Sequence, residues 1–150
     1  MGSRKNKAKR EKVMEKRLLI ATNNRGKVAE IQALLAGLEV DLLTPVELGL
    51  DLEIPEQGQT YAENASHKAV TFAAASGLLS LADDSGLEVD ALDGRPGLHS
   101  NRFGPQPATD ATRRRYLLAQ LAGRPRPWTA RFRATGALAR PGGEVRLAEG

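Results

Sequence analysis

Two adjacent carboxylates, Asp83 and Asp84, follow the apolar run 78–82 and precede the small residues Ser85 and Gly86. A short apolar run predicts a buried strand, and ligand sites in α/β proteins gather where such strands end. One of two neighbouring carboxylates could bind a metal ion while the other accepts a proton from water. The segment therefore predicts a metal-assisted hydrolytic site, although Asp-Ser-Gly is equally typical of a simple turn.

A third carboxylate, Glu56, lies in the surface loop expected over 44–59, ahead of a helix that carries Asn64 and Lys68. Mg²⁺ is typically held by one or two carboxylates together with phosphate oxygens, so Glu56 strengthens the metal hypothesis for Asp84. Asn64 and Lys68 are four residues apart and therefore share one side of the helix. A helix lysine is more often a solvated surface residue, and its spacing alone leaves that interpretation of Lys68 open.

A second polar segment, at positions 22–27, joins an expected strand to an expected helix. Backbone N–H groups, side-chain amides and a lysine at a helix N-terminus are the parts of a phosphate site. The segment matches neither the GxxxxGK[ST] loop nor the GxGxxG turn, and a polar connection capped by an asparagine remains the alternative. Its residues are Thr22, Asn23, Asn24, Arg25, Gly26 and Lys27.

Composition limits the class of protein. The 150 residues suit one domain with a genuine core, and they include no cysteine and two histidines. A disulfide framework and a thiolate metal site are excluded, and a zinc site is not expected. No apolar run approaches the roughly 20 residues of a membrane span, and no signal-peptide pattern follows the start. We therefore expect a soluble, cytoplasmic protein that has no membrane partner.

The basic charge is concentrated at the start of the chain. Residues 1–17 hold eight Lys or Arg and two Glu, so the rest is mildly acidic although the formal net charge is +4. Such a leader predicts a disordered tail on a globular domain at 18–150, with no specific nucleic-acid partner. A nucleic-acid-associated protein that acts through this tail is kept as an alternative.

The elements that must position these residues alternate between strand and helix. An apolar run predicts a strand at 18–22, and the apolar spacing that follows predicts a helix from Lys27 to Gly37. A capping box at Thr60 and a stop at Gly77 delimit a second helix. This order predicts an α/β domain. The other expected elements are strands at 40–43, 78–82, 87–92, 128–138 and 144–148, a turn at 94–97 and a helix at 110–122.

Four of the segments together resemble a known family. TNNRGK at 22–27, ENASHKA at 63–69, ADDSGLEVDAL at 82–92 and GRPGLHSNRFG at 94–104 are similar to the Ham1-type nucleoside triphosphate pyrophosphatases. The resemblance implies an elongated fold in which helices flank a mixed central β-sheet, a homodimer for the full-length chain, and dependence on Mg²⁺. It also implies hydrolysis of ITP, dITP and XTP to the monophosphate and pyrophosphate, which cleanses the nucleotide pool.

The resemblance implies a role at each matching position. Asp84 matches the catalytic acidic residue and, with Glu56, the metal-binding pair; Asp83 matches a helper. The implied substrate contacts are Thr22, Asn23, Asn24, Arg25, Gly26, Lys27, Lys68 and Ser85.

Relatives of the family type continue for about another third of their length, with a GFGYDP-like segment, a later lysine and a Ser-His-Arg motif that hold the base. None of these is present in the 150 residues, so we expect a C-terminally incomplete form of the fold. Base selection needs buried polar groups that match one pattern of donors and acceptors. A nucleotide-binding remnant without catalysis is therefore the other alternative.

Overall fold

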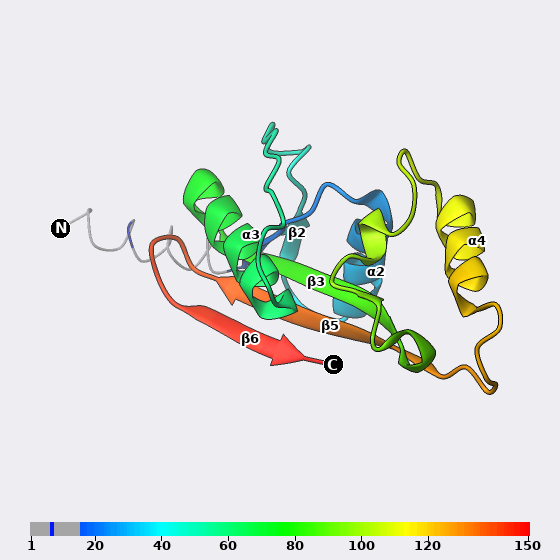
Figure 1. Cartoon of the computed structure of the whole chain (residues 1–150). Helices are drawn as coiled ribbons and strands as arrows, with labels where there is room; N and C mark the ends of the chain where they lie inside the picture. Colours follow the sequence, from blue (N-terminus) through cyan, green and yellow to red (C-terminus); the bar gives the residue numbers. More distant parts are fainter. Residues whose placement is uncertain (1–6, 8–15) are drawn as a thin grey trace.

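The computed structural model describes residue 7 and residues 16–150 (Figure 1). Its helices are α2 (Arg25–Leu35), α3 (Tyr61–Ser76) and α4 (Asp110–Leu121), with short 3₁₀ turns η1 (Asp90–Leu92) and η2 (Ser100–Arg102). Its strands are β1 (Arg17–Ile20), β2 (Asp41–Leu43), β3 (Leu79–Val89), β4 (Pro96–Gly97), β5 (Ala130–Ala139) and β6 (Val145–Glu149). Most of the predicted tail at 1–17 lies outside the described residues. Within the described part, no helix is long and apolar enough to cross a membrane.

The strands form one mixed sheet in the order β2-β1-β3-β5-β6, with β4 added alongside β3. β1 runs parallel to both β2 and β3, whereas β3, β5 and β6 are successively antiparallel. β3 and β5 extend along the molecule, with α3 toward one end and α4 at the other (Figure 1). The expected α/β fold with a mixed central sheet is confirmed.

Helix α3 covers one face of the sheet and builds the main core. Thr60 caps the helix by accepting a hydrogen bond from the N–H of Glu63, and Gly77 ends it in the left-handed conformation, as the sequence predicts. Its buried face carries mostly alanines, which let the helix approach the strands closely. The packed residues include Ala65, Ala69, Phe72 and Ala73 of α3 with Leu19, Ala82, Ala137 and Ala139 of the sheet.

The prediction of two strands, at 78–82 and 87–92, with a turn between them is wrong. β3 is continuous from Leu79 to Val89, and the residues that resembled a turn pair with β5, for example Asp84 with Thr135. The ladder to β1 ends at the pair Ile20 and Leu81. The two aspartates therefore lie in mid-strand, just beyond the carboxyl end of β1. The long ladder with β5 holds the Asp-Ser-Gly segment extended.

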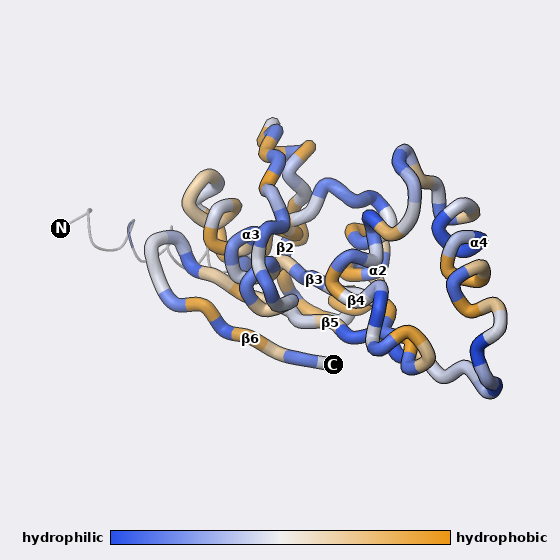
Figure 2. Tube along the Cα trace, viewed as in Figure 1, coloured by the Kyte–Doolittle hydropathy of each residue, from blue (hydrophilic) through white to orange (hydrophobic). Residues whose placement is uncertain are grey.

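The apolar side chains of β5 and α2 are not all in the core. Phe132 is 77% exposed, whereas Thr135 on the other face of β5 is buried because α3 lies on that side. Leu34 of α2 is 82% exposed, whereas Val28, Ile31 and Leu35 of the same apolar stripe are half-buried. Trp128 is half-buried against a smaller apolar cluster near α4. α4 itself alternates between hydrophilic and apolar residues (Figure 2).

Candidate active site

Among the described residues, the most deeply buried ionisable group is the carboxyl of Asp84, which is 2% exposed. Its Oδ2 accepts a hydrogen bond of 2.9 Å from the amide of Asn64, and its Oδ1 accepts one of 3.1 Å from the N–H of Ser85. Burial raises the pKa of Asp84, while the bond from Asn64 and the charge of Lys68 lower it. The site therefore holds a carboxyl group that is costly to ionise but has cationic and amide partners.

Lys68 brings Glu56 and Asp84 together. Its Nζ donates to Oε1 of Glu56 at 2.9 Å and lies 4.0 Å from Oδ1 of Asp84. The Lys68 side chain is only 12% exposed, so the interpretation of a solvated surface lysine is wrong. Glu56, Lys68 and Asp84 thus converge on the face of the sheet that α3 covers.

Two side chains fix the loop that carries Glu56. Oδ1 of Asn64 accepts a hydrogen bond of 2.8 Å from the N–H of Gly58, and Nη2 of Arg102 donates to the carbonyl of Glu56 at 3.2 Å. Asn64 therefore joins this loop to Asp84 through a single amide group. Asn64 is not among the site residues that the sequence predicts; its position four residues before Lys68 is the signal that indicates it.

The loop 22–27 is a capped helix start. Oδ1 of Asn24 accepts hydrogen bonds from the N–H groups of Gly26 and Lys27, at 2.9 and 3.3 Å. The side chain of Asn23 donates to the carbonyl of Leu52 at 2.9 Å, which ties this loop to the one that carries Glu56. The side-chain oxygen of Asn24 is thus used by the helix cap, whereas Nζ of Lys27 reaches Oδ2 of Asp83.

Asp83 and Asp84 point to opposite faces of the sheet. Side chains alternate along a strand, so Asp84 faces α3 while Asp83 faces the N-terminal turn of α2. Oδ2 of Asp83 accepts a hydrogen bond of 2.8 Å from Nζ of Lys27. The expectation of two carboxylates acting side by side is therefore wrong, because adjacent positions of an extended strand cannot share one face.

The serines near the site have different surroundings. Ser100 donates to the carbonyl of Gly97 and accepts from the N–H of Leu87, so its hydroxyl joins η2 to the neighbouring strands. That contact accounts for Ser100 as a structural residue. Ser85 follows Asp84 on β3 and is half-buried on the face of Asp83. Ser85 therefore lies on the side of β3 that carries Asp83, and its implied contact with the substrate stays a prediction.

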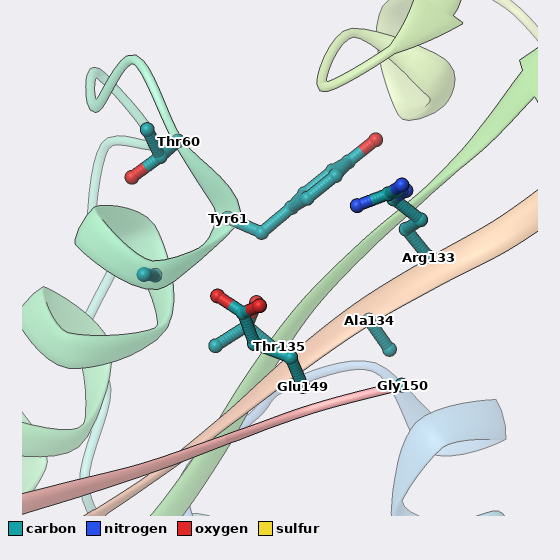
Figure 3. A pocket seen from close by; sticks show the side chains of 8 residues that line it. Thr60, Tyr61, Arg133, Ala134, Thr135, Glu149 and Gly150 are labelled. Atoms are coloured by element: carbon teal, nitrogen blue, oxygen red, sulfur yellow. The ribbon is translucent and has the colours of Figure 1, made fainter.

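A small cavity opens where α3 begins and β5 passes (Figure 3). Its volume is about 100 Å³, and Thr135, the ladder partner of Asp84, lies in its wall. Tyr61 and Arg133 extend over the same side of it (Figure 3). Ligand pockets are typically about 300–1,000 Å³, so this cavity is too small to enclose a whole nucleotide. The other lining residues are Thr60, Ala62, Ala134, Glu149 and Gly150.

The carboxylate oxygens of Glu56 and Asp84 suit a hard cation that binds together with the substrate. Among the described residues, no three His, Cys, Asp or Glu side chains form a group that could hold a metal by themselves. Glu56 and Asp84, however, converge on one position, where the ammonium group of Lys68 now supplies the positive charge. Mg²⁺ commonly uses one or two carboxylates and completes its shell with substrate phosphates and water. The two carboxylates fit that pattern.

Comparison with known proteins gives consistent matches over nearly the whole domain. A family model described as the Ham1 family matches residues 18–150. A dITP/XTP pyrophosphatase of Desulforamulus reducens is 45% identical over 135 residues, which cover 89% of this chain and 67% of that protein. A dITP/XTP pyrophosphatase of Geobacter sulfurreducens is 46% identical over 129 residues, covering 85% of this chain and 65% of that protein. The chain thus spans about two thirds of these relatives' length.

Solved structures agree with the sequence matches. A HAM1 protein from Coxiella burnetii superposes with a TM-score of 0.78 at 36% identity, over 89% of this chain and 69% of that one. A structure from Mycobacterium abscessus, described as a nucleoside-triphosphatase and dITP/XTP pyrophosphatase, gives a TM-score of 0.73 at 37% identity, over 89% and 71% of the two chains.

Proposed function

The chain belongs to the Ham1 family, and on that premise we propose that it is a nucleoside triphosphate pyrophosphohydrolase. It converts ITP, dITP and XTP to the monophosphate and pyrophosphate, and so removes non-standard purine nucleotides from the pool. The observation that carries the proposal is the convergence of Glu56 and buried Asp84 on Lys68. The relatives described as dITP/XTP pyrophosphatases support the substrate class.

The residues on the two faces of β3 have different roles in the proposed reaction. Lys68 on one face and Lys27 on the other neutralise charge that develops on the phosphate oxygens. Asp84 orients a water molecule and accepts its proton while the water oxygen bonds to the α-phosphorus. The bond from that phosphorus to the bridging oxygen breaks, and pyrophosphate leaves. A carboxyl whose pKa is raised by burial is a better proton acceptor than an ordinary aspartate.

Glu56 and Asp84 are the residues that would hold Mg²⁺ together with phosphate oxygens. When bound, the ion neutralises charge on the phosphates and on the leaving group. Asn64 keeps Oδ2 of Asp84 in place, which leaves Oδ1 directed toward Lys68 and the cation position. The proposal includes a cytoplasmic homodimer, for which the family resemblance is the support.

The test is pyrophosphate release with Mg²⁺ from dITP and XTP, compared with dATP and dGTP. We expect turnover that prefers dITP and XTP. Asp84→Asn should still bind nucleotide but lose most of its turnover, since Asn64 can still donate to the new side chain. Turnover that Asp84→Asn leaves intact, or binding of dITP without pyrophosphate release by the unsubstituted chain, would refute the proposal.

A further inference from the structure

Lys27 and Asp83 form an ion pair that joins the start of α2 to the middle of β3. The distance from Nζ to Oδ2 is 2.8 Å, and the side chains are only 19% and 24% exposed. We propose that Asp83 is a positioning residue: it holds the ammonium group of Lys27 at one fixed place beside the substrate phosphates. This inference rests on the proposed function, since phosphate binding by Lys27 is part of it.

The fold makes this pairing possible at one place. β1 pairs with β3 as far as Ile20 and Leu81, and the chain then leaves the sheet to begin α2. Lys27 lies in the first turn of that helix, and Asp83 is two residues beyond Leu81 on the same strand face. The side chain of Asp83 therefore contacts Lys27 just beyond the point where the pairing of β1 with β3 ends.

The surroundings of Asp83 indicate that the pair serves a purpose beyond stabilising the fold. Its Oδ1 is buried and accepts no hydrogen bond within the described part of the chain. A buried carboxylate oxygen that has no hydrogen-bond partner lowers the stability of the folded state. Stabilisation of the fold alone therefore does not account for this ion pair. A lysine has a long, flexible side chain, and fixing it before the substrate binds removes an entropic cost from the reaction.

The two lysines of the site share this arrangement. Glu56 holds Lys68 on the face of the sheet that α3 covers, and Asp83 holds Lys27 on the opposite face. Each cation thus donates a hydrogen bond to one carboxylate, at 2.9 and 2.8 Å respectively, and Lys68 also lies 4.0 Å from Oδ1 of Asp84. Two positive charges in fixed positions on either side of β3 can hold a polyphosphate in one orientation. Asp83 therefore contributes to the reaction through Lys27 and does not touch the substrate.

The ion pair can be tested without any enzymatic activity. In the full chain, acetylation by an activated ester is followed residue by residue with mass spectrometry, in the presence of EDTA. Asp83→Asn should make Lys27 react about threefold faster or more, because an ion pair of this kind restrains the amine. Lys68 and exposed Lys16 are internal controls and should keep their rates. An unchanged rate at Lys27 would overturn the inference.

The consequence for the reaction is tested by separating binding from turnover. Asp83→Asn should bind inorganic pyrophosphate in metal-free buffer at least as tightly as the unsubstituted chain, because a negative charge has been removed. Its kcat for dITP should fall about tenfold without a rise in KM, since orientation is lost while attraction is kept. Asp83→Glu, which keeps the charge, should recover part of the turnover. Lys27→Met is the control that should weaken pyrophosphate binding.

Other results would overturn the positioning role. An unchanged kcat would show that the ion pair has no effect on the reaction. Pyrophosphate binding weakened as strongly in Asp83→Asn as in Lys27→Met would mean that Asp83 is needed to form the site. A binding defect found only with Mg²⁺ would make Asp83 a metal ligand. If the unsubstituted chain shows no turnover, the proposed function fails, while the acetylation and pyrophosphate measurements still decide this inference.

Discussion

The side-chain amide of Asn64 donates a hydrogen bond of 2.9 Å to Oδ2 of Asp84, and both side chains are buried. The same amide accepts a bond from the N–H of Gly58 through its oxygen. One residue of α3 therefore connects the strand that carries the buried carboxyl to the loop that carries Glu56. The site depends on this amide for its shape.

Asn64→Ala should destabilise the protein by about 2–3 kcal/mol, because it removes the hydrogen-bond partner of the buried carboxyl of Asp84 and of the half-buried N–H of Gly58. Urea denaturation followed by circular dichroism measures the change. His67→Ala, on the exposed side of the same helix, is the matched control and should change the free energy of unfolding by less than about 0.5 kcal/mol. Equal effects of the two substitutions would contradict the connecting role of Asn64.

Asp84→Asn should stabilise the metal-free protein near neutral pH. Burial raises the pKa of Asp84 above its ordinary value of 3.8, so the folded state binds this proton more tightly than the unfolded state. The contribution of Asp84 to stability is therefore lost as the pH rises from 3.8 through the raised pKa. The gain in unfolding free energy of Asp84→Asn over the unsubstituted protein should therefore grow across that pH interval and stay constant above it.

Unfolding free energies of both proteins, measured in EDTA from below pH 3.8 to neutral pH, check this expectation. If Asp84→Asn raised the free energy of unfolding by the same amount at both ends of the pH range, the expectation would be contradicted. A pH-independent gain in stability cannot come from the ionisation of Asp84. The asparagine also adds an amide donor at position 84. A pH-independent difference in unfolding free energy between the two proteins would therefore report that donor and not the ionisation of Asp84.

Gly86→Ala should destabilise the protein by about 3 kcal/mol or more, because the added methyl group has no room. A Cβ at Gly86 would lie 2.1 Å from the carbonyl oxygen of Gly97 and 2.6 Å from the hydroxyl of Tyr61. Gly136→Ala on the adjacent strand β5 is the control, since its Cβ would meet only the oxygen of Ala148 at 3.9 Å. Thermal unfolding compares the two, and equal melting temperatures would show that the strands separate easily there.

Lys68→Met should lower kcat for dITP about 100-fold or more, because it removes a fixed positive charge from the phosphates. Methionine matches the lysine side chain as far as Cε and lacks only the ammonium group, so most of the apolar part of the side chain is preserved. Steady-state kinetics with Mg²⁺ measures the effect, and Lys16→Met at an exposed position is the control. A loss that higher Mg²⁺ concentrations fully restore would assign Lys68 to charge balance at the metal position instead of to the phosphates.

Local signals predicted the helices and their ends. Thr60 with Glu63 fixes the start of α3 and Gly77 fixes its end, because caps depend on residues within one helical turn. Apolar spacing predicts a helix from Lys27, and the structure begins it at Arg25. The strand expected at 144–148 lies at Val145–Glu149. The motifs were also sufficient to indicate the family, since their order along the chain is itself a sequence property.

The tertiary structure decided the directions in which the site residues point. Whether the segment at 83–86 forms a turn or continues a strand depends on pairing with β5, some 50 residues later in the chain. That pairing sends Asp83 and Asp84 to opposite faces, where Lys27 and Asn64 meet them. Strand pairing joins residues far apart in sequence, so no local pattern contains it. The sequence by itself indicated the candidate residues Glu56, Lys68 and Asp84, and the tertiary structure determined which side chains lie together and added Asn64 to them.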